Sequence, residues 1–207
     1  MLDRRALALL APVFDAVAKR LAAAGVGADA ISLAGFVLGL AAAVAIATGQ
    51  PAVGLARMAA SRIGDGLDGA VARRTQPTER GAFLDIALDF LFYASIPLAF
   101  AWADPATNAL AAATLLAAFI GTGSTFLAFA ALAAKRGLAS TEFPSKGLYY
   151  LGGLTEATET LSCFALMCLW PQHFASIAYG FAALCAVTIA TRLHAGWRML
   201  GRDQENR

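Results

Sequence analysis

The stretch GDGLDGAVARRTQPTERGAFLDIALDF, which runs from Gly64 to Phe90, decides how this chain folds. It sets four aspartates between segments that are otherwise apolar enough for a membrane interior: Asp65, Asp68, Asp85 and Asp89. On a helix, side chains three or four residues apart share one face. The first two aspartates are three apart and the last two are four apart, so the sequence predicts an acidic stripe on each of two consecutive helices.

The rest of the chain has the composition of a membrane protein. Of its 207 residues, 59% are hydrophobic and only 14% are charged, whereas roughly 25% of the residues of a soluble domain are charged. Three long stretches contain no Asp, Glu, Lys or Arg: residues 30–56, 105–134 and 160–191. Since about 20 apolar residues span a bilayer, several helices are expected to cross it. The net charge of +2 is too small to indicate a nucleic-acid partner.

Turn residues and charges divide the chain into three regions. Residues 1–26 repeat apolar residues at helical period, with most charges elsewhere, which predicts an amphipathic interfacial helix. Residues 27–200 are expected to form one bundle of six transmembrane helices, so the predicted fold class is an all-α membrane protein. A polar cytoplasmic tail is expected at 201–207. The six candidate spans cover about residues 30–48, 52–73, 82–102, 107–134, 147–169 and 174–196.

Basic residues alternate between the two sides of this predicted bundle. The connections TGQPA, ADPAT and WPQH contain no Lys or Arg. Thirteen of the sixteen basic residues lie in the N-terminal segment, in the loops RRTQPTER and KRGLASTEFPSK, and in the tail RMLGRDQENR. Because Lys and Arg collect on the cytoplasmic side of a membrane, both termini are predicted to be cytoplasmic, together with the aspartates.

The two acidic stripes are expected to meet and to bind metal. A short loop joins their helices, so the helices should be antiparallel neighbours. Each buried carboxylate costs about 2.5–3.5 kcal/mol on insertion scales, and mutual repulsion adds to this cost. Oxygen ligands without His or Cys suit Mg²⁺ or Mn²⁺, and four carboxylates suffice for two ions. The sequence thus predicts a two-metal site of the kind that serves displacement at phosphorus.

Small residues continue both stripes. Gly69, Ala72 and Gly81 would let a phosphate ester approach the helix backbones, and Arg73 could meet its negative charge. The alternative is a structural network in which the aspartates only pair with the nearby arginines Arg57, Arg62, Arg73 and Arg74. Of these, Arg62 lies one helical turn before Asp65 and could pair with it.

The stretch resembles the signature of the CDP-alcohol phosphotransferases, DxxDGxxAR followed by GxxxDxxxD. Every fixed position is present: Asp65, Asp68, Gly69, Ala72, Arg73, Gly81, Asp85 and Asp89. The six-span architecture of that family agrees with the expectation above. The resemblance implies an enzyme of phospholipid biosynthesis that moves a phosphatidyl-type group from a CDP-linked lipid, CDP-diacylglycerol, to the hydroxyl of an acceptor alcohol and releases CMP.

The same resemblance implies roles for individual residues. Asp65, Asp68 and Asp85 resemble the metal ligands of the family, and Asp89 resembles the residue that completes the metal site and acts as general base for the attacking hydroxyl. The CDP-lipid would contact a second set: Gly69, Ala72, Arg73 and Gly81. Relatives also indicate a homodimer.

The acceptor alcohol is less clearly marked. In SKGLYYLGGLTEATET, the next polar groups expected to face the bundle interior are Lys146, Glu156 and Glu159. They would bind hydroxyls or an ammonium group of the acceptor. Alternatively, the glutamates would only pair with a buried arginine. The stretch is similar to the GGxxExxE pattern of the phosphatidylinositol-phosphate synthase branch, but Ala157 and Thr160 stand where that branch has arginines. This favours an acceptor without a phosphate, although Lys146 with Arg192 could serve a phosphorylated one.

Two other function classes use acidic residues at membrane depth. A divalent-cation transporter would do so, but the sequence lacks broken helices in paired halves and the small-residue strip would have no role. Intramembrane prenyltransferases resemble larger bundles with an NDxxD-type motif, whereas Gly64 precedes the first aspartate here. Both classes remain alternatives to the transferase at this point.

Overall fold

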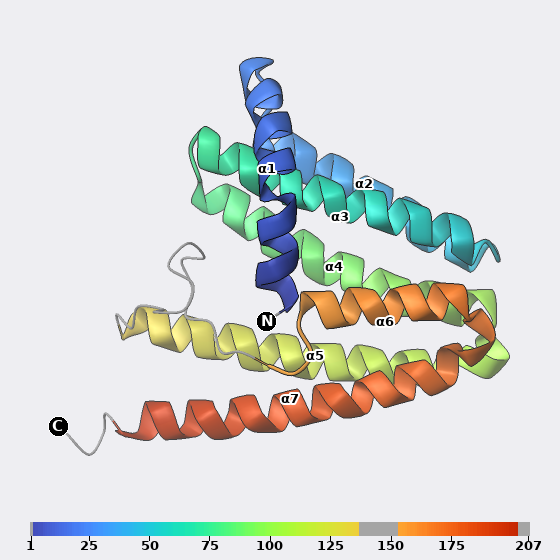
Figure 1. The fold of residues 1–207 in the computed structure, drawn as a ribbon. Coiled ribbons are helices and arrows are strands. Elements are labelled where there is room, and N and C mark those ends of the chain that lie inside the picture. Colours follow the sequence, from blue (N-terminus) through green and yellow to red (C-terminus); the bar gives the residue numbers. More distant parts are fainter. Residues whose placement is uncertain (1, 137–152, 203–207) are drawn as a thin grey trace.

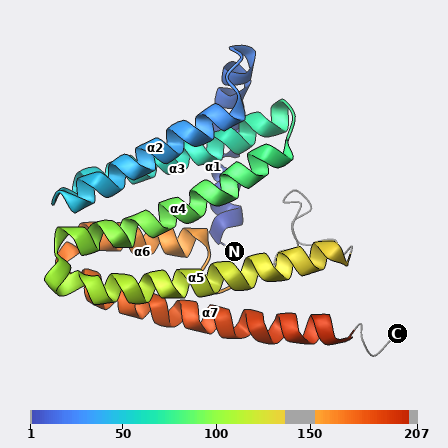
Figure 2. The same ribbon diagram turned by 180° about the vertical axis from the view of Figure 1, so that it is seen from behind.

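The computed structural model describes residues 2–136 and 153–202, and within them it is helical with no strand. Helices α2 to α7 run roughly along one direction in stacked layers, whereas α1 crosses them steeply (Figure 1). The same layers are visible from behind (Figure 2). The elements are α1 (Leu2–Ala23), α2 (Ala28–Ala47), α3 (Pro51–Arg74), α4 (Glu79–Ala103), α5 (Pro105–Lys135), α6 (Ala157–Leu169), the 3₁₀ turn η2 (Pro171–His173) and α7 (Phe174–Arg202).

Local sequence signals explain where the helices begin. Gly49 has a φ of +78° in the tight turn after α2, a conformation that glycine adopts without steric cost. Thr78 caps α4 by accepting a 3.0 Å hydrogen bond from the Gly81 amide, and Asp104 caps α5 by accepting a 3.2 Å bond from Thr107. These side chains satisfy amide groups that a helix start leaves without partners.

Large apolar side chains of α4, α5, α6 and α7 form the main core. Phe100 on α4 stacks on Phe174 at the start of α7, with ring centroids 4.6 Å apart. Three cysteines are free and buried in this region, where they pack as small apolar residues: Cys163, Cys168 and Cys185.

The outer surface of the bundle is apolar as well. The side chains of Trp102, Leu110 and Ile120 are 75%, 73% and 72% exposed. Exposed apolar area of this extent suits contact with lipid rather than with water. Together with the long apolar helices, it identifies an integral membrane protein.

Four helices, rather than the predicted six, are long and apolar enough to cross a membrane among the described residues. They cover Ala28–Ala47, Glu79–Ala103, Pro105–Lys135 and Pro171–Gly201. Helix α3 has the length but carries the charges of the aspartate motif and its arginines, and α6 has only 13 residues. The prediction of six such spans is therefore wrong by this measure, although both helices belong to the bundle. The first part of the predicted span 147–169 lies outside the described residues.

Helix α1 packs on the C-terminal part of α3. Ala18 is fully buried against Ala70 and Val71, and Phe14 and Leu21 border this small cluster. The Asp15 carboxylate accepts hydrogen bonds of 2.8 and 2.5 Å from the Arg74 guanidinium. Helix α1 is therefore attached to the helix that carries the first two aspartates.

Candidate metal centre

The aspartate motif lies where α3 and α4 face each other beside α2. Helix α2 packs closely on both helices, whereas α3 and α4 share few close backbone approaches. The close packing of α2 depends on glycine: a Cβ atom on Gly35 would lie 3.4 Å from the carbonyl oxygen of Ser61. The two motif helices meet as predicted through side chains near the aspartates, but most of their close backbone packing is against α2.

Three of the four aspartates converge. Asp65, Asp68 and Asp85 each offer a carboxylate oxygen, and these oxygens all lie within 4.8 Å of one another. Asp68 is buried, Asp65 is half-buried and Asp85 is exposed, so the cluster opens to one side. An all-oxygen set of this kind is the donor set of a hard divalent ion, and the residues present therefore fit the predicted metal.

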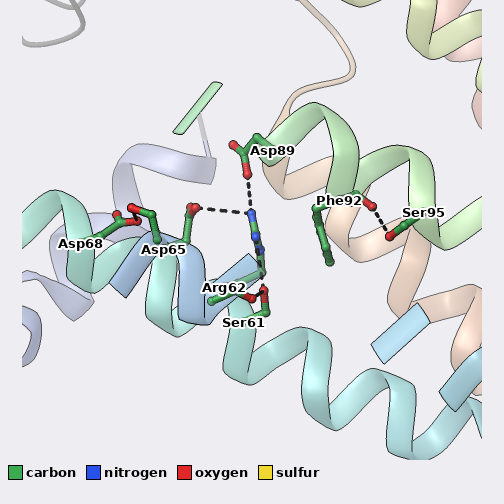
Figure 3. A network of polar contacts seen from close by, with 9 residues as sticks. Ser61, Arg62, Asp65, Asp68, Asp89, Phe92 and Ser95 are labelled. Atoms are coloured by element: carbon green, nitrogen blue, oxygen red, sulfur yellow. Dashed lines mark hydrogen bonds and ion pairs between the residues drawn. The ribbon is translucent and has the colours of Figure 1, made fainter. Parts of the chain in front are cut away.

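The fourth aspartate contacts an arginine. Figure 3 shows Asp89 of α4 pointing toward Arg62 of α3, whose Nη1 lies 2.7 Å from the Asp89 Oδ1. The same nitrogen lies 3.6 Å from the Asp65 Oδ1, which confirms the predicted pair between Arg62 and Asp65. The contact with Asp89 was not predicted, because sequence spacing links Arg62 only to residues of its own helix.

Helix α2 supplies groups that the motif does not contain. The hydroxyl of Ser32 donates a 2.5 Å hydrogen bond to the Asp68 Oδ2, and the Ser61 hydroxyl donates a 2.7 Å bond to the Gly35 carbonyl. The sequence offered a signal for Ser32, which is the only hydroxyl residue in Ala28–Ala47. A small pocket here is lined by Ser32, Gly35, Phe36, Ser61, Arg62, Asp65, Asp85, Leu88 and Asp89.

The predicted CDP-lipid residues lie around this cluster. A Cβ on Gly69 would come within 3.3 Å of the Arg73 Nη1, and one on Gly81 would come within 3.3 Å of the Asp29 Oδ1. Ala72 is half-buried and Arg73 is exposed. An added methyl group would therefore crowd Arg73 at position 69, and Thr78 and Asp29 at position 81.

The other arginines near the motif have different partners. Arg74 binds Asp15 of α1, and Arg57 donates a 3.0 Å hydrogen bond to the Ala41 carbonyl. Arg80, in the loop end of α4, pairs with Asp29. Among these described contacts, Arg62 pairs with aspartates of the motif, whereas Arg57 and Arg74 bind groups outside it.

Glu156 and Glu159, two of the predicted acceptor residues, are not among the residues that line this pocket. Lys146 lies outside the described residues. Glu156 is the N-cap of α6, and its amide donates a 3.1 Å hydrogen bond to the Glu159 carboxylate. Its own carboxylate accepts from the Gly153 amide at 3.2 Å. Both glutamates therefore form a capping box that starts the helix.

Arg192, which the sequence offered as a partner for a phosphorylated acceptor, is 8% exposed on α7. It donates a 3.1 Å hydrogen bond to the Thr122 carbonyl of α5. A Cβ on Gly153 would lie 3.1 Å from its Nη2. Arg192 thus connects α7, α5 and the segment before α6.

Comparison with known proteins agrees with the motif. Residues 26–192 match the family described as CDP-alcohol phosphatidyltransferase. The chain is 48% identical over 200 residues to the inner membrane protein YnjF of Escherichia coli, which covers 97% of each chain. A shorter match, 47% identical over 78 residues, covers 37% of this chain and 38% of the archaetidylinositol phosphate synthase of Methanothermobacter thermautotrophicus.

Solved structures share the fold. The phosphatidylinositol phosphate synthase PgsA1 of Mycobacterium tuberculosis with CDP-DAG bound has a TM-score of 0.72 at 22% identity, over 90% of this chain and 94% of that chain. The same enzyme in complex with manganese and citrate has a TM-score of 0.70 at 22% identity, over 89% and 88%. The match over residues 26–192 and the near full-length relative show that this chain belongs to the CDP-alcohol phosphatidyltransferase family, whose members are transferases of phospholipid biosynthesis.

Proposed function

We propose that the protein transfers a phosphatidyl-type group from CDP-diacylglycerol to the hydroxyl of an acceptor alcohol and releases CMP. The observation that carries this proposal is the convergence of three carboxylates, from Asp65, Asp68 and Asp85, within 4.8 Å and beside Asp89. A related fold with CDP-DAG bound supports a CDP-linked lipid as the donor. Family membership leaves the cation transporter and the prenyltransferase without an observation in their favour.

The proposal includes two divalent ions, Mg²⁺ or Mn²⁺. Asp65, Asp68 and Asp85 would hold them together with Asp89, since carboxylate oxygens are the ligands that both ions prefer. A solved neighbour that contains manganese supports this choice. When bound, such ions neutralise a diphosphate and stabilise the departing phosphate group.

The chain's own residues have distinct parts in the proposed reaction. The acceptor oxygen attacks the phosphorus that carries the diacylglycerol, the bond from this phosphorus to the CMP oxygen breaks, and CMP leaves. Asp89 accepts the proton of the attacking hydroxyl as a general base. The CDP-lipid would lie along the surface made by Gly69, Ala72, Arg73 and Gly81.

The acceptor is proposed to bind near the start of α6, where Glu156 and Glu159 would bind hydroxyl or ammonium groups and Lys146 would be close in sequence. Ala157 and Thr160 supply no positive charge beside these glutamates. The proposal therefore favours a polyol or an amino alcohol over an inositol phosphate.

The placement in the membrane is also part of the proposal. The distribution of Lys and Arg favours a cytoplasmic active site and cytoplasmic termini. Helix α1 would lie at the membrane interface, and the protein would form a homodimer like the relatives it resembles.

A direct assay tests the proposed function. Purified protein in lipid is given Mg²⁺, CDP-diacylglycerol and one acceptor from a panel: glycerol 3-phosphate, inositol, inositol phosphate, serine or ethanolamine. CMP release with one acceptor is expected, and Asp89→Asn should abolish turnover while CDP-lipid binding persists. Asp104→Asn is the matched control, because Asp104 caps the next helix at the far end of α4 and Asn also caps. Absence of CMP with every acceptor, or full activity of Asp89→Asn, would contradict the proposal.

A further inference from the structure

The guanidinium of Arg62 lies between two aspartates of the proposed metal site. Its Nη1 contacts the Asp89 Oδ1 at 2.7 Å and the Asp65 Oδ1 at 3.6 Å (Figure 3). The side chain of Arg62 is only 15% exposed. A fixed positive charge therefore bridges α3 and α4 next to the three converging carboxylates.

Other groups hold the same guanidinium from its opposite side. Its central carbon lies 4.1 Å from the centroid of the Phe92 ring, a cation–π distance. Its Nη2 donates a 3.3 Å hydrogen bond to the Ser61 hydroxyl, which is itself fixed by its bond to the Gly35 carbonyl. Its Nε is buried and has no acceptor among the described residues. Arg62 thus has anchors that do not depend on the aspartates.

The acidic residues consequently form two unlike groups. Asp65, Asp68 and Asp85 converge on one point, and Asp89 is not part of that set. Instead, its Oδ1 accepts a hydrogen bond from Arg62. A divalent ion between Asp65 and Asp89 would need oxygens that Arg62 now contacts, and it would lie next to a positive charge in a low-dielectric site, where repulsion is strong. Arg62 in its present position and such an ion exclude each other.

We propose that Arg62 occupies the place of one divalent ion in the metal-free protein and that the two ions bind in order. The first ion binds to Asp65, Asp68 and Asp85. The second binds only when Arg62 withdraws from Asp89 and remains on Phe92 and Ser61. Arg62 is then a positioning residue that weakens the second ion site and keeps Asp89 paired until that ion arrives. This inference rests on the proposed two-ion function.

Mn²⁺ binding to the purified full-length protein, without lipid substrate, tests this order. Free Mn²⁺ is followed by electron paramagnetic resonance. Wild type should bind one ion tightly and a second more weakly. Arg62→Gln and Arg62→Met both remove the charge, and Met also keeps an apolar stem against Phe92. Both variants should raise the Mn²⁺ affinity of the second site roughly tenfold or more and change that of the first site less. Arg57→Gln is the matched control. It removes a charge from the same helix, and Arg57 contacts only the Ala41 carbonyl in the described contacts. This variant should bind Mn²⁺ as wild type does.

Each other result has a definite meaning. Equal Mn²⁺ affinities of the second site in wild type and in the neutral variants would overturn the role of Arg62. Two equally tight sites in wild type would do the same. The proposed enzyme activity would stand in both cases if CMP release is observed. No Mn²⁺ bound by wild type would overturn both the metal site and this inference. If the neutral variants fail to fold, a structure of the wild type with Mn²⁺ decides: Arg62 must have left the Asp89 Oδ1, and its retention beside two bound ions would overturn the inference.

Discussion

The Ser32 hydroxyl on α2 donates a 2.5 Å hydrogen bond to the Oδ2 of Asp68 on α3. Asp68 is the buried member of the three converging carboxylates, so this bond orients the ligand that is least able to be oriented by water. The proposed metal site is therefore built from three helices, although its aspartates come from two.

Removing this hydroxyl should weaken metal binding without destroying the site. Ser32→Ala removes the hydroxyl donor of the Asp68 carboxylate, and a hydrogen bond to a charged group contributes about 1.5–3 kcal/mol. The Mg²⁺ concentration for half-maximal CMP release is expected to rise roughly tenfold or more. Ser162→Ala is the control, because Ser162 is exposed and bonds only to the Thr158 carbonyl in the described contacts. An unchanged Mg²⁺ requirement would show that Ser32 does not position Asp68.

The contact between α1 and α3 should be sensitive to a single methyl group. A Cβ atom on Gly66 would lie 2.5 Å from the Phe14 Cε2, and overpacking of this kind costs about 1–3 kcal/mol. Gly66→Ala is expected to lower the Tm of the detergent-solubilised protein. The double variant with Phe14→Ala should recover part of the loss, since the clash is removed. If Gly66→Ala lowers the Tm equally in the presence of Phe14 and in the Phe14→Ala background, the result would contradict this contact.

The pair between Asp15 and Arg74 should stabilise the attachment of α1 only above acidic pH. Hydrogen bonds from the Arg74 guanidinium lower the pKa of the Asp15 carboxyl below its usual value of 3.8. A group with a lowered pKa in the folded state adds stability above its unfolded pKa and loses it as the pH falls through the folded pKa.

Asp15→Asn should therefore lower the Tm slightly near pH 7, and the difference from wild type should shrink as the pH falls below about 4. Both residues are exposed to solvent, so salt near 1 M should shrink it as well. A difference that persists at low pH would mean that Asn disturbs something other than the ion pair.

The capping box on α6 allows acceptor binding to be separated from helix stability. Gln can replace Glu at the third helical position of such a box, so Glu159→Gln should leave the Tm close to that of wild type. If Glu159 also binds the acceptor, as proposed, the KM for the acceptor should rise roughly tenfold or more, since hydrogen bonds to a charged group are strong. The exposed Glu79, in the first turn of α4, supplies the control Glu79→Gln. An unchanged KM would limit Glu159 to capping.

Sequence periodicity predicted the three converging carboxylates, because their positions on each helix depend on local spacing. Two aspartates three apart on α3 and a third on the next helix suffice to bring three carboxylates together once the helices are placed. The Ser32 contact joins residues 36 apart in the chain, and the contact of Arg62 with Asp89 joins residues 27 apart. Such contacts depend on how α2 packs against α3 and α4, which no local pattern specifies.

The errors have physical causes that can be named. The hydropathy of α3 is lowered by the same charges that form the site, so α3 does not qualify as a span by composition. The start of α6 was misplaced because Glu156 caps it, and Glu is not among the residues that usually cap helices. The motif helices α3 and α4 meet through side chains, and α2 packs closely on both. Their short loop does not determine which helix fills the space beside them.

The central claim is that these carboxylates hold divalent ions against the diphosphate of a CDP-lipid. The most direct measurement is electron–nuclear double resonance of Mn²⁺-loaded protein with CDP-diacylglycerol, which detects ³¹P nuclei close to the ion. We expect ³¹P couplings in wild type and loss of the bound-Mn²⁺ signal when Asp65 and Asp68 are both replaced by Asn. Bound Mn²⁺ without ³¹P coupling, or Mn²⁺ bound equally well by the double variant, would contradict the account.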